Sequence, residues 1–477
     1  MVTQPDPRRW KALALLGTAF FMVILDSTIV YVALPKIQED LDFSTGGVQW
    51  VVSVYLLSFG GFLLLGGRSA DLLGRRRMFM VGAGLFAASS LMCGLAWAAE
   101  VLIAFRAVQG ISAAIMAPTA LSLLLTTFED GPERNRALGI WGGIGGVGAT
   151  AGLLIGGPIT QGLGWEWIFF VNIPVGVSVV ALSPVLLRES RDRDRPRTFD
   201  VAGAVTITAS LLLLVAGITG GPQAGWSSAR TVGFLAASAA LFGLSLLIER
   251  GSSAPLVPLR ILRSPTLVGG NVVLLAAGMS VDGMLFVLTL YAQEVLGYST
   301  VQFGLLTASM TVMSVVGAYG GQALVTRTSV RLVAATGIVL VGAACLLLMQ
   351  LSVDGGFPVD VLLGLLIFGT GLGAAFVASQ IAALDGVPEH ESGLAAGLVD
   401  TSFSMGGALG LAILSTVAVS RTNEMVEDTG QSQQLEPLTE GFRSAFVVAL
   451  AFPVLGLVAA MLLLGRRKAA DRTPAHP

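Results

Sequence analysis

Long apolar stretches recur along the whole chain, and a membrane-spanning helix needs about 20 such residues in a row. Fourteen windows meet that requirement: 11–34, 47–66, 78–97, 101–127, 135–159, 165–187, 200–219, 229–249, 266–292, 300–323, 331–351, 358–384, 392–419 and 442–464. The first window is too long for a signal peptide and carries an acidic residue, so we expect it to be retained. The sequence therefore predicts an all-α membrane protein with 14 transmembrane helices.

Composition agrees with a chain that lies mostly in lipid. Hydrophobic residues make up 54% of the 477 residues, and charged residues make up 12%, about half the roughly 25% of a soluble domain. The mean hydropathy is +0.80. The net charge is −2 and there is no long basic run, so nucleic acid is not an expected partner. We expect the partners to be the lipid bilayer, protons and a small hydrophobic substrate, with the chain acting as a monomer.

The basic residues predict the orientation, because cytoplasmic loops of membrane proteins carry the excess of Lys and Arg. With the N-terminus placed inside, 23 of the 28 basic residues fall in inner segments. Only Lys36, Arg230, Arg421 and Arg443 fall outside, and Arg106 falls within a span. Both termini are therefore predicted to be cytoplasmic, in a multi-pass protein of the plasma membrane. We read 188–198 as a solvated inner linker and 420–441 as the longest outer loop.

The chain matches itself weakly at an offset of about 255 residues. Asp26 aligns with Asp282, the segment from Gly66 aligns with the one from Gly320, and Pro132 aligns with Pro388. Two parallel six-helix halves are a recurring transporter plan, with the substrate site near the midplane. The predicted domains are a first bundle over 1–187, a linker over 188–265 that holds the two inserted spans, a second bundle over 266–464, and a cytoplasmic tail over 465–477.

Ionisable groups inside predicted spans are the leading site candidates, because such groups are costly in a bilayer and mark function. They are Asp26, Arg106, Asp282 and Asp400. Asp26 and Arg106 lie at similar depths below the outer ends of their helices, about 12 and 8 Å by the rise per residue, so an ion pair is possible if the two helices are neighbours. We expect protonation of Asp26 or Asp282 to be coupled to substrate release. The alternative is that these carboxyl groups only join neighbouring helices.

Two further patterns concern conformational change. Gly148, Gly152 and Gly156 recur every fourth residue in the fifth window, with Gly157 adjacent, and small residues at that spacing let helices approach closely. The loop after the second window combines Asp71 with positive charge between two turn glycines. We expect that loop to form a charge clamp on the inner side; its residues are Gly67, Asp71, Gly74, Arg75 and Arg76.

Four sequence signatures in order resemble the major facilitator superfamily, specifically its fourteen-span drug:proton antiporter branch. They are LDSTIVYVALP from Leu25, GRSADLLGRRR from Gly67, R-x-x-Q-G from Arg106, and W-x-W-I-F-x-x-N-x-P-x-G from Trp165. The resemblance covers nearly the whole chain. It implies two major-facilitator bundles plus a two-helix central insertion, and proton-coupled export of hydrophobic, often cationic, drugs or antibiotics by alternating access. It also implies a proton role for Asp26 and Arg106 and a clamp role for the Asp71 loop.

Three positions depart from the family pattern. Tyr31 stands where the family's first span has Asn, and the fifth span lacks the usual Gly-Pro before its glycine pair, having Gly152-Leu153 instead. Asp400 stands where Asn is usual in span 13. The extra carboxyl group would favour cationic substrates or add a proton site.

Other functions fit the residues less well. No G-x-x-x-x-G-K-[ST] motif exists, which excludes ATP hydrolysis by a P-loop in this chain. His390 and His476 are the only histidines and lie outside the spans, so we expect no catalytic residues, no metal site and no cofactor beyond a proton gradient. A channel would be expected to show rings of charge or a filter repeat. A narrow exporter of an endogenous metabolite or self-made antibiotic stays open as an alternative, and an uptake symporter is a weaker one.

Overall fold

The fold was analysed in a computed structural model, which describes residues 8–128, 132–189, 201–252, 261–353, 361–385, 387, 392–429 and 435–465. The elements in these residues are helical, α1 to α17 with short 3-10 and π segments. The chain divides into two compact units. The first comprises Met1–Ser44, Trp50–Leu211 and Ala240–Leu256, and the second comprises Thr45–Gln49, Leu212–Ala239 and Val257–Pro477.

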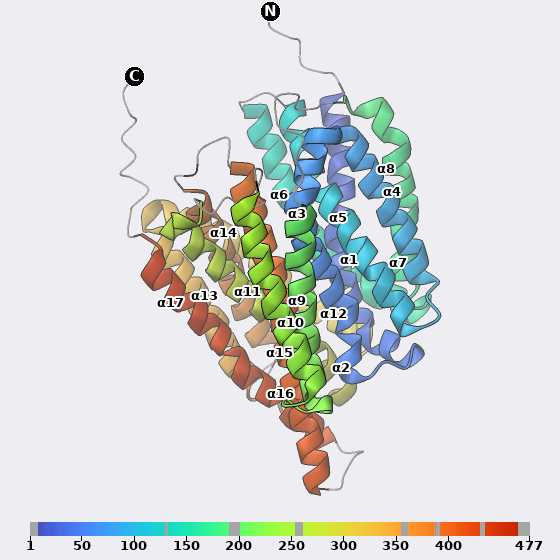
Figure 1. The fold of residues 1–477 in the computed structure, drawn as a ribbon, viewed down its shortest axis with the longest axis vertical. Helices are drawn as coiled ribbons and strands as arrows, with labels where there is room; N and C mark the ends of the chain where they lie inside the picture. Colours follow the sequence, from blue (N-terminus) through green and yellow to red (C-terminus); the bar gives the residue numbers. More distant parts are fainter. Residues whose placement is uncertain are drawn as a thin grey trace, which may run out of the picture. The chain divides into compact units, whose positions relative to one another are not determined.

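The helices of the first unit are long, apart from the four-residue α7 (Figure 1). They are α1 (Arg9–Asp40), α3 (Trp50–Leu73), α4 (Arg75–Gly94), α5 (Ala99–Thr127), α6 (Pro132–Gly162), α7 (Trp167–Phe170) and α8 (Asn172–Leu186). Turn glycines follow two of them, α3 and α6, where Gly74 at φ 111° and Gly164 at φ 106° adopt a backbone conformation that a Cβ disfavours. The predicted span 165–187 corresponds to α7 and α8 together, which are separated only at Val171 and form one apolar stretch, Trp167–Leu186, that is long enough to cross a membrane.

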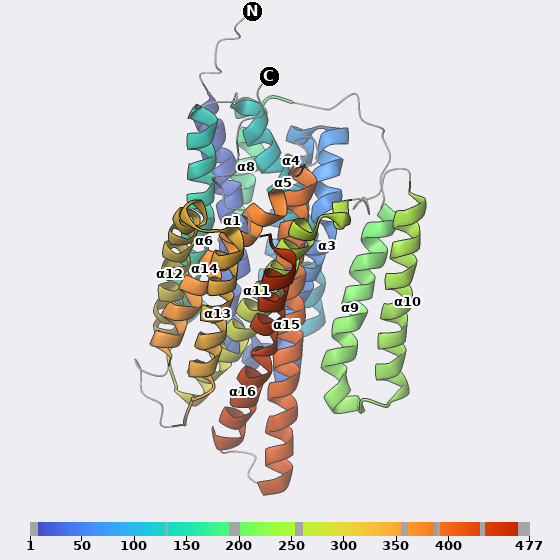
Figure 2. The same cartoon turned by 90° about the vertical axis from the view of Figure 1, so that its left-hand side faces the viewer.

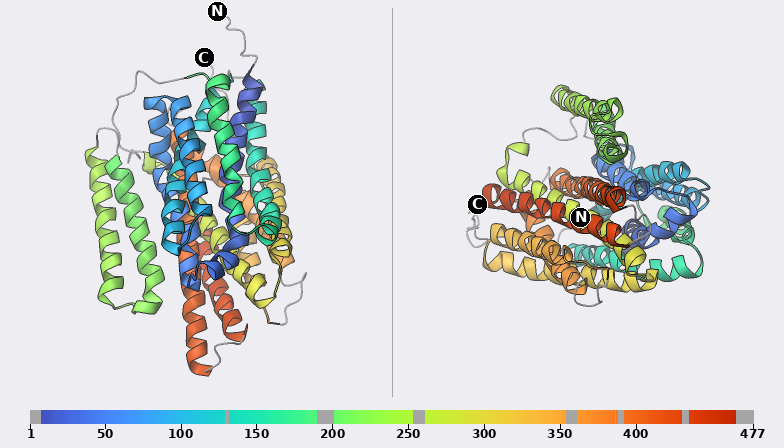
Figure 3. Two further views of the ribbon diagram at one scale, coloured as in Figure 1. Left: turned by 90° about the vertical axis from the view of Figure 1, so that its right-hand side faces the viewer. Right: turned by 90° about the horizontal axis from the view of Figure 1, so that it is seen from below.

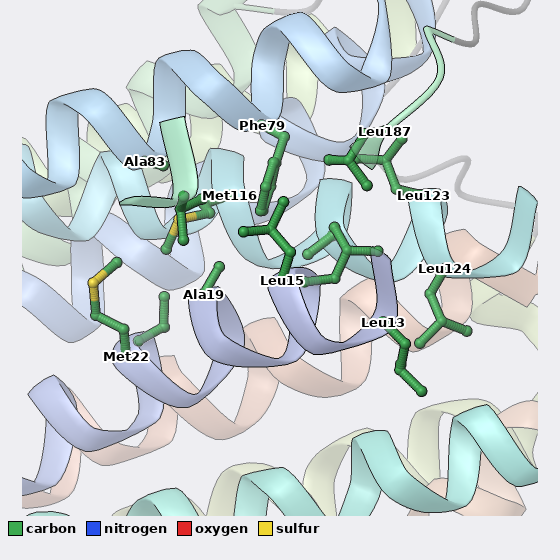
Figure 4. Close-up of a cluster of buried hydrophobic side chains, with 14 of the residues drawn as sticks. Leu13, Leu15, Ala19, Met22, Phe79, Ala83, Met116, Leu123, Leu124 and Leu187 are labelled. Carbon is green, nitrogen blue, oxygen red and sulfur yellow. The ribbon is translucent and has the colours of Figure 1, made fainter. Parts of the chain in front are cut away.

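The core of the first unit lies where α1, α4 and α5 meet (Figure 4). Leu15 and Met22 of α1 pack in the same cluster as Phe79 of α4 and Met116 of α5, and each is at most 7% exposed. Leu187, just after α8, closes one end of this cluster. The members of this cluster on α1 lie between Ala12 and Val23, in the half of the helix that begins at Arg9. Asp26, the first charged residue of α1 after them, lies outside the cluster.

The second unit has its own set of long helices. They are α11 (Pro265–Leu290), α12 (Thr300–Arg327), α13 (Val330–Leu348), α14 (Leu362–Leu384), α15 (Ser392–Thr429), α16 (Leu435–Ala449) and α17 (Ala451–Leu463), with the short α2 (Thr45–Val48) beside α15. Side-chain caps start three of these helices, from Ser264, Ser299 and Ser329. The helices α15 and α16 lie side by side (Figure 3).

Two helices lie between the long helices in sequence, α9 (Val201–Ala224) and α10 (Ala229–Gly251) (Figure 2). The end of α9 and the start of α10 form a helical hairpin, in which Gly225 turns the chain at φ 86°. The two helices pack closely there, since a Cβ on Gly217 would lie 2.8 Å from the Leu235 side chain. Among the described residues, thirteen helices are long and apolar enough to cross a membrane. The predicted span 200–219 lies within α9, in which Val205–Gly221 is a further apolar stretch.

The same neighbours recur in the two units when each is viewed by itself. In the first unit α1 packs against α5, α6 and α8, while α5 also packs against α3 and α4. In the second unit α11 packs against α14, α15 and α17, while α14 also packs against α12 and α13. The internal sequence match aligns α1 with α11, so the repeated sequence is accompanied by a repeated packing arrangement.

The structure corrects one predicted loop. Within the predicted outer loop 420–441, α15 continues to Thr429 and α16 begins at Leu435, so most of that stretch is helical. No Gly or Pro interrupts 420–429, and Arg421 pairs with Glu424 one turn later at 3.0 Å, which supports a helix. The last predicted span, 442–464, comprises parts of α16 and α17, which break at Leu450 but together form one apolar stretch, Leu435–Leu463, that is long enough to cross a membrane.

Candidate functional site

A buried ion pair between α1 and α5 lies inside the first unit. Arg106 Nη1 donates to Asp26 Oδ2 at 2.6 Å, and both side chains are 0% exposed. The predicted similarity in depth is thus realised as direct contact, because α1 and α5 are neighbours. A charge at this depth is tolerated only when it is paired and hydrogen-bonded. The pair is therefore the strongest candidate for a functional site in the unit.

Three polar side chains complete this site, which we call the Asp26 cluster: Asp26, Ser90, Arg106, Gln109 and Asn172. Asp26 Oδ1 accepts from Gln109 Nε2 at 2.9 Å and from Asn172 Nδ2 at 2.7 Å. Ser90 Oγ accepts from the same two amide nitrogens, at 2.7 and 3.3 Å. All five side chains are at most 1% exposed, and they come from α1, α4, α5 and α8.

The Arg106 guanidinium is also held from the side of α3. Its Nε donates to the Val51 carbonyl at 2.9 Å, and its central carbon lies 4.2 Å from the centre of the Tyr55 ring. A second ring, that of Phe169, lies 5.7 Å away. Contacts between a cation and aromatic faces are favourable in a desolvated site. Among the described residues, the Arg106 Nη2 and the Tyr55 hydroxyl have no hydrogen-bond partner.

The glycine face of α6 packs on the turn of α1 that carries Asp26. A Cβ on Gly152 would lie 2.8 Å from the Leu25 carbonyl oxygen and 3.0 Å from the Ile29 nitrogen. A Cβ on Gly156 would lie 2.9 Å from Ile29 Cγ1, and one on Gly148 would lie 3.2 Å from Ile24 Cβ. The neighbouring Gly157 is buried. The predicted close helix approach is therefore present, and its partner is the helix of the ion pair.

The same kind of contact occurs between α11 and α15 in the second unit. A Cβ on Gly283 of α11 would lie 2.8 Å from Leu414, and Gly406 and Gly410 of α15 abut the backbone at Leu275 and Met279. These glycines are not among the predicted site residues. Their spacing of four residues in α15 was a usable signal, since it repeats the spacing seen in α6.

The predicted charge clamp involves an acidic partner that the sequence did not suggest. Glu189 Oε1 accepts from the Arg76 backbone N–H at 3.1 Å, and its other oxygen lies 3.8 Å from Arg76 Nε and 3.7 Å from Arg77 Nε. This carboxylate covers the first turn of α4, which Arg75 begins after Gly74. Glu189 had been placed in the solvated linker; its side chain is only 28% exposed because it folds back onto α4.

The other predicted clamp and site residues lie outside the Asp26 cluster. A Cβ on Gly67 would lie 3.6 Å from Pro118 Cβ of α5, whereas the side chain of Asp71 lies outside the described residues. Asp282 is 9% exposed on α11, and Asp400 is exposed on α15. Both belong to the second unit, so the Asp26 cluster is formed without them.

A second ion pair joins α1 and α6 near their N-terminal ends. Arg9 Nε and Nη2 contact the two carboxylate oxygens of Glu133, each at 2.9 Å, and Arg136 lies over the Trp10 ring at 5.3 Å. The hydrogen bonds from Arg9 hold the pKa of Glu133 below its usual range. A bidentate pair of this kind orients the two helix ends, although its contribution to stability is small because Glu133 is 53% exposed.

We expect Glu133→Gln to lower the thermal stability of the purified protein slightly at neutral pH. Because the folded-state pKa of Glu133 is lowered, the pair stabilises fully above the ordinary glutamate pKa and is lost as the pH falls through the lowered value. Melting curves of wild type and variant should therefore converge in acid. Glu427→Gln, at an exposed acidic residue of α15, is the control. A difference that persisted unchanged into acid would contradict this explanation.

Three residues of the Asp26 cluster were not among the predicted site residues. Gln109 lies three residues after Arg106, hence on the same helix face, and Asn172 is an amide inside an apolar span. Both were visible as polar groups in predicted spans, which the cost of burial marks as functional. Ser90 carried no such signal, because serine is common in helices that cross membranes.

Long apolar helices that enclose a fully buried ion pair are typical of a multi-pass membrane transporter. The family model described as Major Facilitator Superfamily matches residues 16–411. The chain belongs to the Major Facilitator Superfamily.

Relatives and solved structures agree with that assignment. The chain is 34% identical to the tetracenomycin C resistance and export protein of Streptomyces glaucescens, over 97% of this chain and 92% of that protein. It is 38% identical to the cephamycin export protein of Amycolatopsis lactamdurans, over 86% of this chain and 85% of that protein. The structure also resembles the crystal structure of a bacterial homologue of the human lysosomal transporter Spinster, with a TM-score of 0.66 at 16% sequence identity. The matched region covers 96% of this chain and 98% of that chain. The last comparison supports the fold alone.

Proposed function

We propose that this protein exports hydrophobic drugs or antibiotics, cationic ones included, in exchange for protons by alternating access. The observation that carries the proposal is the buried Asp26–Arg106 pair at 2.6 Å. A carboxyl group in a dry site, next to a competing cation, can exchange a proton when its surroundings change. The names of the relatives, which refer to resistance and export of antibiotics, support the direction of transport and the class of substrate.

The proposal includes a topology. Thirteen long apolar helices and α9, whose apolar stretch is Val205–Gly221, would together give fourteen spans. Six would form each half and α9 and α10 would be the insertion, with both termini in the cytoplasm and the protein a monomer in the plasma membrane. The excess of basic residues in the inner segments supports this orientation. The energy source would be the proton gradient, with no cofactor.

Roles for the other candidates follow from their positions. Asp282 is buried in α11, the counterpart of α1, and would be a second proton site. Asp400 is exposed on α15, so its carboxylate would favour cationic substrates. The contacts of Glu189 with Arg76 and Arg77 tie the α3–α4 turn to the end of α8, which supports a clamp that must open and close during transport.

Efflux of ethidium from cells that express the protein tests the proposal, with and without a protonophore and beside Asp26→Asn. We expect efflux that the protonophore stops and that Asp26→Asn reduces to the level of cells without the protein. Membrane insertion of each variant should be checked in parallel. If folded wild-type protein gave no efflux, the broad exporter would be rejected in favour of a narrow exporter of one metabolite. Net uptake would instead indicate a symporter.

A further inference from the structure

The two oxygens of Asp26 have different kinds of partner. Oδ2 accepts from the charged Arg106 at 2.6 Å, whereas Oδ1 accepts only from the neutral amides of Gln109 and Asn172, at 2.9 and 2.7 Å. The orientation of the Gln109 amide is set by its other end, because Gln109 Oε1 accepts from Arg106 Nη1 at 2.8 Å and a guanidinium can only donate. The nitrogen of Gln109 must therefore face Asp26.

This arrangement decides which oxygen can carry a proton. An amide NH₂ group donates and does not accept, so a hydrogen on Oδ1 would point at two other hydrogens. A hydrogen on Oδ2 leaves Oδ1 as a carbonyl oxygen, which still accepts from both amides. Oδ2 is also the oxygen that Arg106 contacts, so the incoming proton and the guanidinium compete for one atom.

We propose that Asp26 takes up its proton on Oδ2 and thereby releases Arg106, while Asn172 and Gln109 hold Oδ1 in both protonation states. The inference rests on the proposed proton exchange and deepens it. One O–H bond forms with a proton from hydronium, which becomes water, the contact from Arg106 Nη1 to Oδ2 breaks, and the guanidinium keeps all its own protons. Asn172 is a positioning residue, because it acts on the carboxyl group and not on the substrate.

The remaining contacts show what the released guanidinium would do. Arg106 keeps its bonds to the Val51 carbonyl and to Gln109, and it still lies on the Tyr55 ring. Protonation would thus loosen α1 from Arg106 without detaching α1 from α8, since Asn172 still holds Oδ1. Among the described residues, the charged group that acts on Asp26 is Arg106 of α5, and Asp26 in turn acts electrostatically on Tyr55 of α3 and Cys93 of α4.

Infrared difference spectroscopy of the full-length protein in lipid nanodiscs tests the assignment without any substrate. Between acid and alkaline pH, wild type should give a protonated-carboxyl C=O band that Asp26→Asn removes. In Asn172→Leu the carbonyl loses a donor, so this band should move to higher wavenumber. Its midpoint should rise by about one to two pH units, because a hydrogen bond to the charged form is lost. Ser178→Ala, on α8 but outside the Asp26 cluster, should leave both unchanged.

The outcomes separate this inference from the proposed function. An Asp26 band that Asn172→Leu leaves in place would overturn the positioning role while proton exchange stood. Absence of any Asp26-dependent band at all pH values would overturn both. Where Asn172→Leu does not fold, Gln109→Leu removes the other donor to Oδ1 and should shift the band in the same direction, and an unshifted band would again overturn the inference.

Discussion

Arg106→Gln should destabilise the folded protein by about 3 to 5 kcal/mol, because it leaves a buried carboxylate without its cation. Asp26 is 0% exposed, so no water replaces the lost contact. Arg106 also holds the Val51 carbonyl and Gln109, whose acceptor oxygens would lose their donor. We expect a large fall in melting temperature of the purified protein and no substrate efflux.

The double variant distinguishes charge from packing. Asp26→Asn introduced into Arg106→Gln removes the unpaired charge and should recover most of the lost stability, although not transport. Coupling between the two substitutions in a double-mutant cycle is the measured quantity. If the two losses simply added, the ion pair would not be the reason for the destabilisation, and the packing of Arg106 on Tyr55 would explain it instead.

Gly152→Ala should abolish most transport and destabilise the protein by about 1 to 3 kcal/mol, the usual range for overpacking. The added methyl group would lie 2.8 Å from the Leu25 carbonyl oxygen and 3.0 Å from the Ile29 nitrogen. Both are backbone atoms of α1 and cannot rotate away, so α1 must move as a unit. Asp26 follows Leu25 directly, and its hydrogen bonds would be displaced by that movement.

Two other glycines of α6 provide a graded control. Gly143 has nothing within 4 Å of its added Cβ, so Gly143→Ala should be neutral or slightly stabilising. Gly148 would meet the Ile24 side chain at 3.2 Å, which can adjust, so Gly148→Ala should give an intermediate loss. Efflux and melting temperature should both follow this order. Equal effects of all three substitutions would indicate a general requirement for helix flexibility.

Several site features could be read from the sequence because they are local or periodic. Depth within a span follows from counting residues along a helix, which placed Asp26 and Arg106 at comparable levels. The shared face of Gly148, Gly152 and Gly156 follows from the helical repeat. The repeat between the two halves was visible as a constant offset. None of these features needed knowledge of how one helix is rotated against another.

Other features depend on that rotation. The sequence shows Gln109 and Asn172 as polar residues within predicted spans. Only the packing of α1, α5 and α8 brings both amide groups within hydrogen-bond distance of one oxygen of Asp26. The sequence places Glu189 in a solvated linker, because a charge-rich segment that follows a span is usually exposed to water. In the structure its carboxylate accepts a hydrogen bond from the Arg76 backbone in the first turn of α4. The pairing of Arg9 with Glu133 likewise joins residues that are 124 positions apart.

The amino-acid sequence alone determined that this chain lies in a membrane as long helices, and which few charges those helices bury. Hydropathy sums over a single segment, so it needs no partner to be read. The tertiary structure alone decided which polar group each charge meets and how the two oxygens of Asp26 differ. Hydrogen bonds are short and directional, so they depend on the position and rotation of separate helices, which no single segment specifies.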